Sequence, residues 1–295
     1  VMGLAAYGDP RFADRFRAQL VRVLPAGSFE LNVRLLDFHL ARAGHFTKEF
    51  VELFGAPRGR DEEITQRHRD VAASAQLVLE ETLLHLGRHL RKVTGVDALC
   101  LAGGVAYNCV ANGRLRAELG FRDVFVPPAA GDSGAALGAA LWLAAKRGDG
   151  SARPRMPSAF LGPGFEEGEL HAALVRAGLS CSSLSDDQLC ERVAEELAKG
   201  RLVFWYQGRM EWGPRALGNR SLLADPRRED VRALINSKVK FREPFRPFAP
   251  SVLAERAGEA GNRQDDDEGR QPHGGQRRDI GAGGKTADDS IDPAH

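Results

Sequence analysis

Three arginines lie within one short glycine- and proline-rich stretch, Gly208–Ser221, whose sequence is GRMEWGPRALGNRS. They are Arg209, Arg215 and Arg220. Glycine and proline at this density disfavour a stable helix, so the stretch is expected to form a loop. A guanidinium group stays charged and matches phosphate or carboxylate oxygens with paired hydrogen bonds. The stretch therefore predicts a binding site for a phosphate-bearing anion.

The neighbouring segments support this prediction but leave an alternative open. RLVFWYQG, before the loop, predicts a buried strand, and Pro214 suits the first turn of a short helix, whose free N–H groups favour an anion. Further positive charge follows downstream at Lys238, Lys240, Arg242 and Arg246. The alternative is a solvated basic loop balanced by nearby acids, namely Glu211, Asp225 and Glu243.

Two other glycine-rich turns are candidates for chemistry. LAGGVAYNCVANGRL predicts a strand, a turn at Gly103 and Gly104, and a helix, an order that places phosphate at a helix N-terminus. It matches neither a Walker loop nor Gly-x-Gly-x-x-Gly, so a purely structural turn fits equally well. In PPAAGDSGAALGAAL, Asp132 is either the N-cap of the next helix or an active-site carboxylate that binds a metal. Spacing alone favours the cap.

A histidine pair resembles a metal site in spacing only. His85 and His89 lie four residues apart on a predicted helix, as metal-binding pairs do. They sit in mid-helix beside Arg88 and Arg91, however, and far along the chain from the glycine-rich loops. This position favours a surface or half-buried pair over a metal site.

The order of the predicted elements indicates an α/β fold. Pro10–Leu24 predicts a short helix and residues 61–94 a long one, ended by Gly95. Strand, helix, strand and helix follow up to residue 148, which is α/β order. After a linker at 149–165, the sequence predicts two amphipathic helices, the strand RLVFWYQG, a helix PRREDVRALINSKV and a loop that ends in a short strand.

These elements divide the chain into three parts, which are residues 1–150, 151–253 and 254–295. The last part contains only two large aliphatic residues after Glu255, Ile280 and Ile291, and no aromatic residue. Such a composition buries too little apolar area to offset chain entropy, so this tail is expected to be disordered.

Composition limits the possible partners and compartment. The 295 residues carry a net charge of +1, which gives no overall signal for nucleic acid or membrane binding. No apolar run approaches the ~20 residues that a membrane helix needs. The four cysteines form no Cys-x-x-Cys pair, which favours a reducing, cytoplasmic compartment.

Five motifs, in order, resemble those of the O-carbamoyltransferases of nodulation-factor and antibiotic biosynthesis. They are MGLAAYG, LCLAGGVAYNCVANGRL, VPPAAGDSGAALGAAL, GRMEWGPRALGNRSLLADPR and NSKVKFREPFRPFAPSVL. The resemblance covers residues 1 to about 253. It implies an actin/hexokinase-like (ASKHA) domain that performs carbamoyl transfer with a bound metal, followed by a YrdC-like domain that forms carbamoyl-adenylate.

The resemblance also implies substrates and roles. Carbamoyl phosphate and ATP would yield carbamoyl-adenylate, whose carbamoyl group passes to a hydroxyl of a sugar or antibiotic-like metabolite. The implied catalytic phosphate clamp is formed by Arg209, Arg215 and Arg220, and the implied binding residues are Gly103, Gly104, Asn108, Asn219, Ser221, Lys240, Arg242 and Arg246. Asp132 matches the metal-binding aspartate of the family, whose metal is expected to be a divalent ion such as iron.

Two departures from the family pattern predict a gene fragment. The family's paired metal-binding histidines have no counterpart in place here, and the segment after Leu253 lacks the expected strands and His-Val-Asp-Gly motif. A frameshift near residue 255 would explain the second departure. The chain is therefore expected to be an inactive carbamoyltransferase fragment or, alternatively, a non-catalytic remnant that binds ATP and carbamoyl phosphate.

Overall fold

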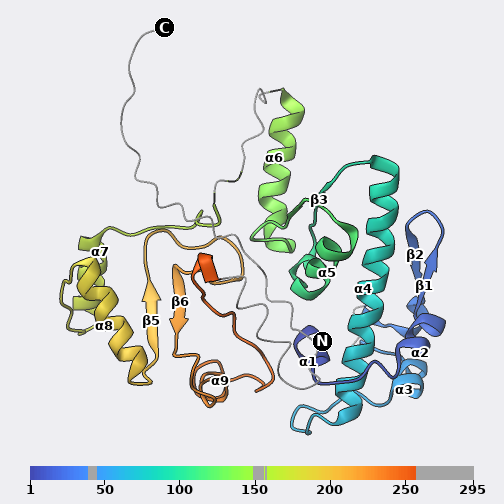
Figure 1. The fold of residues 1–295 in the computed structure, drawn as a ribbon, viewed down its shortest axis with the longest axis horizontal. Coiled ribbons are helices and arrows are strands. Elements are labelled where there is room, and N and C mark those ends of the chain that lie inside the picture. Colours follow the sequence, from blue (N-terminus) through green and yellow to red (C-terminus); the bar gives the residue numbers. More distant parts are fainter. Residues whose placement is uncertain (39–44, 149–155, 157, 257–295) are drawn as a thin grey trace.

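The computed structural model describes residues 1–38, 45–148, 156 and 158–256, and these form a mixed α/β structure in two regions. In Figure 1 the N-terminal region, from blue to green, and the C-terminal region, from yellow to orange, lie side by side. The N-terminal elements are α1 (Met2–Ala5), α2 (Ala13–Gln19), β1 (Val21–Leu24), β2 (Ser28–Leu31), α3 (Lys48–Phe54), α4 (Gln66–Thr94), β3 (Ala98–Cys100), α5 (Cys109–Leu119), β4 (Asp123–Phe125) and α6 (Ala135–Arg147).

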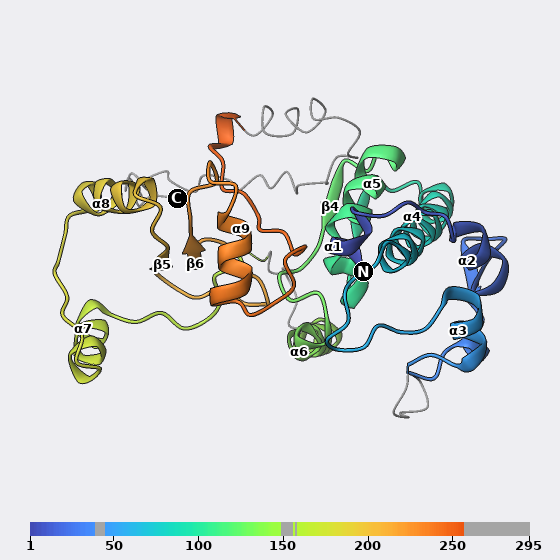
Figure 2. The same ribbon diagram turned by 90° about the horizontal axis from the view of Figure 1, so that it is seen from below.

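The long helix α4 organises the N-terminal region. A reciprocal cap between Thr65 and His68 begins the helix, and Gly95, at φ 66°, ends it as the sequence predicts. One face of α4 contributes Val78 to a core with Phe16 and Phe54. Further along, α4 packs against α5 through an apolar cluster that contains Leu84, Leu99, Leu115, Leu119 and Phe121. Figure 2 shows α2 and α5 on different sides of α4.

The predicted strand–helix–strand unit is confirmed. Strands β3 and β4 pair in parallel, with Leu99 opposite Val124, and α5 connects them. Helix α6 follows β4, and none of its side chains is buried. In both views α6 lies on the side of the N-terminal region that faces the C-terminal region.

The prediction of a helix from Pro10 to Leu24 is wrong for its last four residues. Val21–Leu24 is β1, which pairs with β2 in an antiparallel hairpin. The turn requires left-handed backbone at Ala26, at φ 58°, and at Gly27, at φ 65°. A Cβ atom at Gly27 would lie 2.5 Å from the Cβ of His89, so glycine also allows the hairpin to approach α4.

The C-terminal region contains α7 (Glu167–Arg176), α8 (Asp186–Ala198), β5 (Val203–Tyr206), β6 (Arg220–Leu223), α9 (Val231–Leu234) and a π-helical turn over Ile235–Val239. Ser185 caps α8, as predicted, by accepting a hydrogen bond from the N–H of Gln188. Strands β5 and β6 form an antiparallel hairpin. The predicted short strand at the end of the 240–253 loop is absent from these described residues.

The two regions contact each other directly. The guanidinium group of Arg232 donates to the hydroxyl of Tyr7 at 3.0 Å. A Cβ atom at Gly3 would lie 3.5 Å from the Pro247 ring, which shows that α1 and the 240–253 loop are in close contact. The predicted linker residues 149–155 and 157, and the predicted tail from 257 onward, lie outside the described residues. Ala254–Arg256, where that tail was expected to begin, form a short 3₁₀ helix.

Within the described residues, no helix is both long enough and apolar enough to cross a membrane.

Candidate functional site

The arginine-rich stretch joins β5 to β6 as the loop of a hairpin. The expected short helix after Pro214 is not formed, and residues 207–219 contain no helix. The free N–H groups of this loop do bind an anion, but the anion is a side chain of the loop itself. The backbone N–H groups of Leu217 and Asn219 donate to the Oε1 atom of Glu211 at 2.6 and 2.8 Å. Sequence reasoning missed this internal carboxylate as the loop's organising group.

Glu211 is ionised at the centre of the loop. Its side chain is fully buried and pairs with Arg220, whose Nε atom lies 2.9 Å from its Oε2 atom. Burial raises the pKa of the Glu211 carboxyl, but hydrogen bonds from Arg220 and from the N–H groups of Leu217 and Asn219 outweigh it and lower the pKa to about 2. The expected balance of the loop's charge by Glu211 is therefore confirmed for Arg220.

Arg209 and Asn219 also make internal contacts. Arg209 donates from Nε to the carbonyl of Gly162 at 2.9 Å and from Nη2 to the carbonyl of Leu161 at 3.1 Å. The side-chain amide of Asn219 donates to the carbonyl of Arg209 at 2.6 Å. Together with Arg220, these residues hold the loop to itself and to the segment that precedes α7. Their implied contacts with phosphate remain a prediction.

A basic groove lies downstream of α9, where the sequence predicts a second cluster of positive charge. It has a volume of about 620 Å³, within the usual range for ligand sites, and is lined by Arg58, Arg60, Ser237, Phe241, Arg242, Glu243 and Arg246. Four guanidinium groups and one carboxylate line the groove, and the carboxylate of Glu243 pairs with Arg246 at 2.8 Å. Sequence reasoning identified Arg242 and Arg246 but missed Arg58 and Arg60.

Electrostatics connects Arg215 to this groove. Burial lowers the pKa of the Arg242 guanidinium, and the positive charges of Arg246 and Arg215 lower it further against the opposing effect of Glu243. Arg215 and Lys240 are exposed, and neither makes an ion pair with any described residue. Of the three loop arginines, Arg215 is thus the one whose charge adds to the groove.

Asn236 positions the arginines of the groove. Its side chain is buried, with 1% exposed, within the π-helical turn that follows α9. Its Oδ1 atom accepts from Nε of Arg242 at 2.7 Å, and its Nδ2 atom donates to the carbonyls of Pro244 and Arg246 at 3.3 and 3.0 Å. These bonds fold the 240–247 loop around one amide, and Nη2 of Arg242 donates to the carbonyl of Pro247 at 3.4 Å. The motif NSKVKFRE contains this residue, but its role follows only from the contacts.

The turn after β3 has the expected geometry. Gly103 has φ 96°, and a Cβ atom at Gly103 or Gly104 would meet no atom within 4 Å, so both face open space. The N–H of Gly103 donates to the carbonyl of Ala130 at 2.7 Å, and the hydroxyl of Tyr107 accepts from the N–H of Gly131 at 3.1 Å. The turn therefore lies directly against the segment that leads to Asp132.

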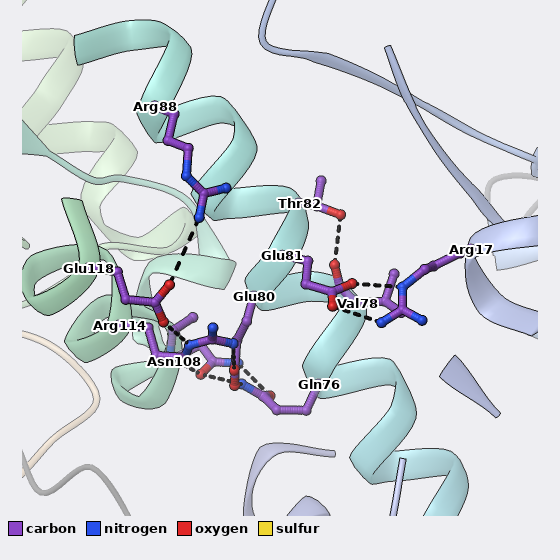
Figure 3. Close-up of polar contacts among 11 residues, drawn as sticks. Arg17, Gln76, Val78, Glu80, Glu81, Thr82, Arg88, Asn108, Arg114 and Glu118 are labelled. Atoms are coloured by element: carbon purple, nitrogen blue, oxygen red, sulfur yellow. Dashed lines mark hydrogen bonds and ion pairs between the residues drawn. The ribbon is translucent and has the colours of Figure 1, made fainter. Parts of the chain in front are cut away.

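Asn108 is the N-cap of α5 and belongs to a polar network with α4 (Figure 3). Its Oδ1 atom accepts from the N–H of Ala111 at 3.1 Å, and its amide exchanges hydrogen bonds with Gln76 at 2.9 and 3.1 Å. Gln76 in turn donates to the buried Glu80, which pairs with Arg114 at 2.7 Å. The side chain of Asn108 is thus engaged between two helices, and its implied contact with nucleotide remains a prediction.

Asp132 does not cap a helix. It is exposed, and neither the 3₁₀ turn Asp132–Gly134 nor α6 has a side-chain cap. The N-cap role that spacing alone favoured for Asp132 is therefore wrong, and its carboxylate is available for a ligand. Among the described residues, no group of three or more His, Cys, Asp and Glu side chains is arranged to hold a metal ion. Those residues therefore do not form a metal site around Asp132.

Three of the predicted motifs approach one another. The Gly103 turn contacts Ala130, as described above, and the arginine loop contacts the same segment from the other region. Gly213, at φ 113°, lies so close that a Cβ atom there would be 2.3 Å from the carbonyl oxygen of Pro128. His85, by contrast, bonds through Nε2 to the carbonyl of Leu24 at 2.8 Å, and it is half-buried, as expected.

Known families match both regions. The carbamoyltransferase N-terminal domain matches residues 1–141, and the carbamoyltransferase C-terminal domain matches residues 194–273. The second match starts within α8, includes the arginine loop and the groove arginines Arg242 and Arg246, and continues past residue 253. The N-terminal match includes Arg58, Arg60 and Asp132.

Curated proteins with similar sequences cover most of this chain. Nodulation protein NolO of Bradyrhizobium diazoefficiens is 44% identical over 88% of the chain and 45% of its own length. Nodulation protein NolNO of Sinorhizobium fredii is 41% identical over 88% of the chain and 37% of its own length. An uncharacterised protein of Synechocystis is 45% identical over 88% of the chain and 43% of its own length. The chain thus spans less than half the length of these relatives, and it belongs to the carbamoyltransferase family.

Proposed function

We propose that this chain binds the phosphate groups of carbamoyl phosphate and ATP in the basic groove, as part of an ATP-dependent transfer of a carbamoyl group to a hydroxyl group. The observation that carries the proposal is the groove itself, where four arginines face one carboxylate. Carbamoyl phosphate and ATP are both anionic, so they repel each other unless fixed positive charge lies between them. Guanidinium forks supply that charge and bind phosphate oxygens in pairs.

The residues of the groove would bind and orient, and the reaction would take place between the bound substrates. In the proposed reaction, water attacks the phosphorus of carbamoyl phosphate, the bond between that phosphorus and the carbamoyl oxygen breaks, and inorganic phosphate and carbamate form. A carbamate oxygen then bonds to the α-phosphorus of ATP, and the bond from that phosphorus to pyrophosphate breaks. Arg242 and Arg246, fixed by Asn236, would stabilise the charge that develops on the phosphate oxygens. Transfer to an alcohol belongs to the metal-dependent step that the family resemblance implies, and the described residues give no basis for deriving it.

Family membership and motif order support the proposal for the ATP-binding and carbamoyl-phosphate-binding roles. The acceptor hydroxyl is proposed to belong to a sugar or an antibiotic-like metabolite. A second candidate is a protein that binds both phosphates without transferring the carbamoyl group. Among the described residues, Asp132 belongs to no group of three or more His, Cys, Asp and Glu side chains that could hold a metal ion, which favours this second candidate.

Isothermal titration of the folded chain tests the proposal. Arg246→Ala should remove a charge-assisted contact worth roughly 1.5–3 kcal/mol and weaken ATP or carbamoyl phosphate binding about ten- to a hundred-fold. Arg116→Ala is the matched control, because Arg116 is exposed on α5 and makes no ion pair with a described residue. Equal affinities of wild type, Arg246→Ala and Arg116→Ala would refute the proposal. Pyrophosphate release from ATP and carbamoyl phosphate separates the two candidates, because only the enzyme produces it.

A further inference from the structure

We infer that Arg58 and Arg60 are triphosphate-binding residues, so that the triphosphate of a nucleotide links the N-terminal region to the C-terminal region. Arg58 and Arg60 belong to the loop between α3 and α4, whereas Arg242 and Arg246 belong to the loop after α9. The groove is therefore a shared site, with two guanidinium groups from each region. This inference deepens the proposed function and rests on it for the identity of the anion.

The loop that contains Arg58 and Arg60 is held in place. Arg67, on α4, donates to the carbonyls of Phe54 and Ala56 at 3.0 and 2.8 Å. Glu62 accepts from the N–H of Gly59 at 2.8 Å, and its own carbonyl accepts from Nη1 of Arg58 at 2.6 Å. The loop therefore presents its arginines from a fixed backbone, which lowers the entropic cost of binding a ligand.

Much of the donor capacity of these two arginines is unused. Arg58 bonds within its loop through Nη1, and its Nε and Nη2 atoms make no hydrogen bond with a described residue. Arg60 makes no side-chain hydrogen bond or ion pair with a described residue. Asp61, Glu62 and Glu63 follow in sequence, but none lines the groove. Glu243 is the one acid in the lining, and it is paired with Arg246.

Positive charge on both sides makes the shared site repulsive when empty. The pKa of Glu243, on the C-terminal side of the groove, is lowered first by its own backbone N–H, then by Arg246, and also by the positive charge of Arg58. The charge of Arg58 therefore acts across the groove. Arg242 similarly experiences the charges of Arg246 and Arg215. A polyanion in the groove converts this repulsion between the regions into attraction. A triphosphate carries more negative charge than a single phosphate and distributes it over three linked phosphate groups, so it can contact arginines of both loops at the same time.

The test compares anions on the folded chain by isothermal titration, using tripolyphosphate, ATP and inorganic phosphate. The double variant Arg58→Ala/Arg60→Ala should bind tripolyphosphate and ATP about ten- to a hundred-fold more weakly than the wild type. Its affinity for inorganic phosphate should fall less than about threefold. Arg34→Ala/Arg116→Ala, at two exposed arginines outside the groove, is the control for the change in net charge and should alter none of them. Arg60→Ala alone guards against misfolding, because Arg60 makes no side-chain contact that the fold would lose, and it should reproduce part of the loss.

Hydrogen exchange provides the readout for linkage. Tripolyphosphate should slow amide exchange both in residues 55–62 and in residues 240–247 of the wild type, and only in 240–247 of Arg58→Ala/Arg60→Ala. Protection confined to 240–247 in the wild type, or unchanged tripolyphosphate affinity in Arg58→Ala/Arg60→Ala, would overturn the inference. If those results occur while Arg246→Ala still weakens binding, the proposed function stands and only the linkage fails. If Arg246→Ala also has no effect, both fail.

Discussion

Replacing Glu211 by Gln tests whether the internal carboxylate holds the arginine loop. The substitution keeps the shape of the side chain but removes its charge. It also places an amide donor or a weaker acceptor opposite the Nε atom of Arg220, which now lies 2.9 Å from a carboxylate oxygen. The pKa of Glu211 falls from 4.5 to about 2 on folding, which corresponds to roughly 3 kcal/mol. Solvent screening at Arg220, whose side chain is 39% exposed, reduces the expected loss to about 2 kcal/mol.

The pH dependence gives this prediction a sign. A carboxyl whose pKa is lowered by folding stabilises the protein above its unfolded pKa, and the stabilisation disappears as the pH falls through the folded value. The difference in unfolding free energy between wild type and Glu211→Gln should therefore be full above pH 4.5 and shrink toward pH 2. Urea denaturation at a series of pH values measures it. Glu229→Gln, at an exposed acid without a described ion pair, is the control and should stay within about 0.5 kcal/mol of wild type.

The reasoning would be refuted if Glu211→Gln matched the control at pH 7, or if its difference from wild type did not change between pH 5 and pH 2.

Two further predictions concern the hairpin and the metal. Gly27→Ala should destabilise the chain by about 1–3 kcal/mol in urea denaturation, because the new Cβ atom would lie 2.5 Å from the Cβ of His89 and the backbone is left-handed. Gly138→Ala, in α6 with no atom within 4 Å of the new Cβ atom, should instead stabilise it by about 0.5–1 kcal/mol, and a similar loss in both variants would contradict the explanation. After gel filtration the chain should retain no stoichiometric iron or zinc by elemental analysis, because the described residues place no second or third protein ligand with Asp132, and such a metal needs three or more.

Helical periodicity made much of the fold predictable. Helix α4 was predicted from apolar residues at three- and four-residue spacing, and its end from Gly95. The β3–α5–β4 unit followed from two short apolar runs separated by a helical one. The β1–β2 hairpin was not predicted, because its turn places Ala26 in a left-handed conformation that a sequence pattern does not reveal. Whether the two regions have the ASKHA and YrdC-like folds implied by resemblance stays a prediction.

Only the downstream arginines of the groove could be predicted from the sequence, because the groove is formed by segments that lie far apart along the chain. Arg242 and Arg246 belong to a motif that resembles one of the O-carbamoyltransferase family, and their positive charge is visible in the sequence. Arg58 and Arg60 lie in a different region, and only the tertiary structure brings them to the same groove. The two basic residues in APRGR were the available signal, but three acids follow them directly, which makes the segment resemble an ordinary solvated loop.

The arginine loop shows that a single motif can divide its charges between stability and binding. Arg220 is neutralised by a buried carboxylate of the same loop, and Arg209 is hydrogen-bonded to two backbone carbonyls. Arg215, between them in sequence, is exposed and lowers the pKa of Arg242 in the groove. The rigid frame formed by the first two therefore fixes the position of the third. Loss of ligand binding in an Arg220 variant would consequently not show that Arg220 contacts the ligand, because loosening the loop displaces Arg215 as well.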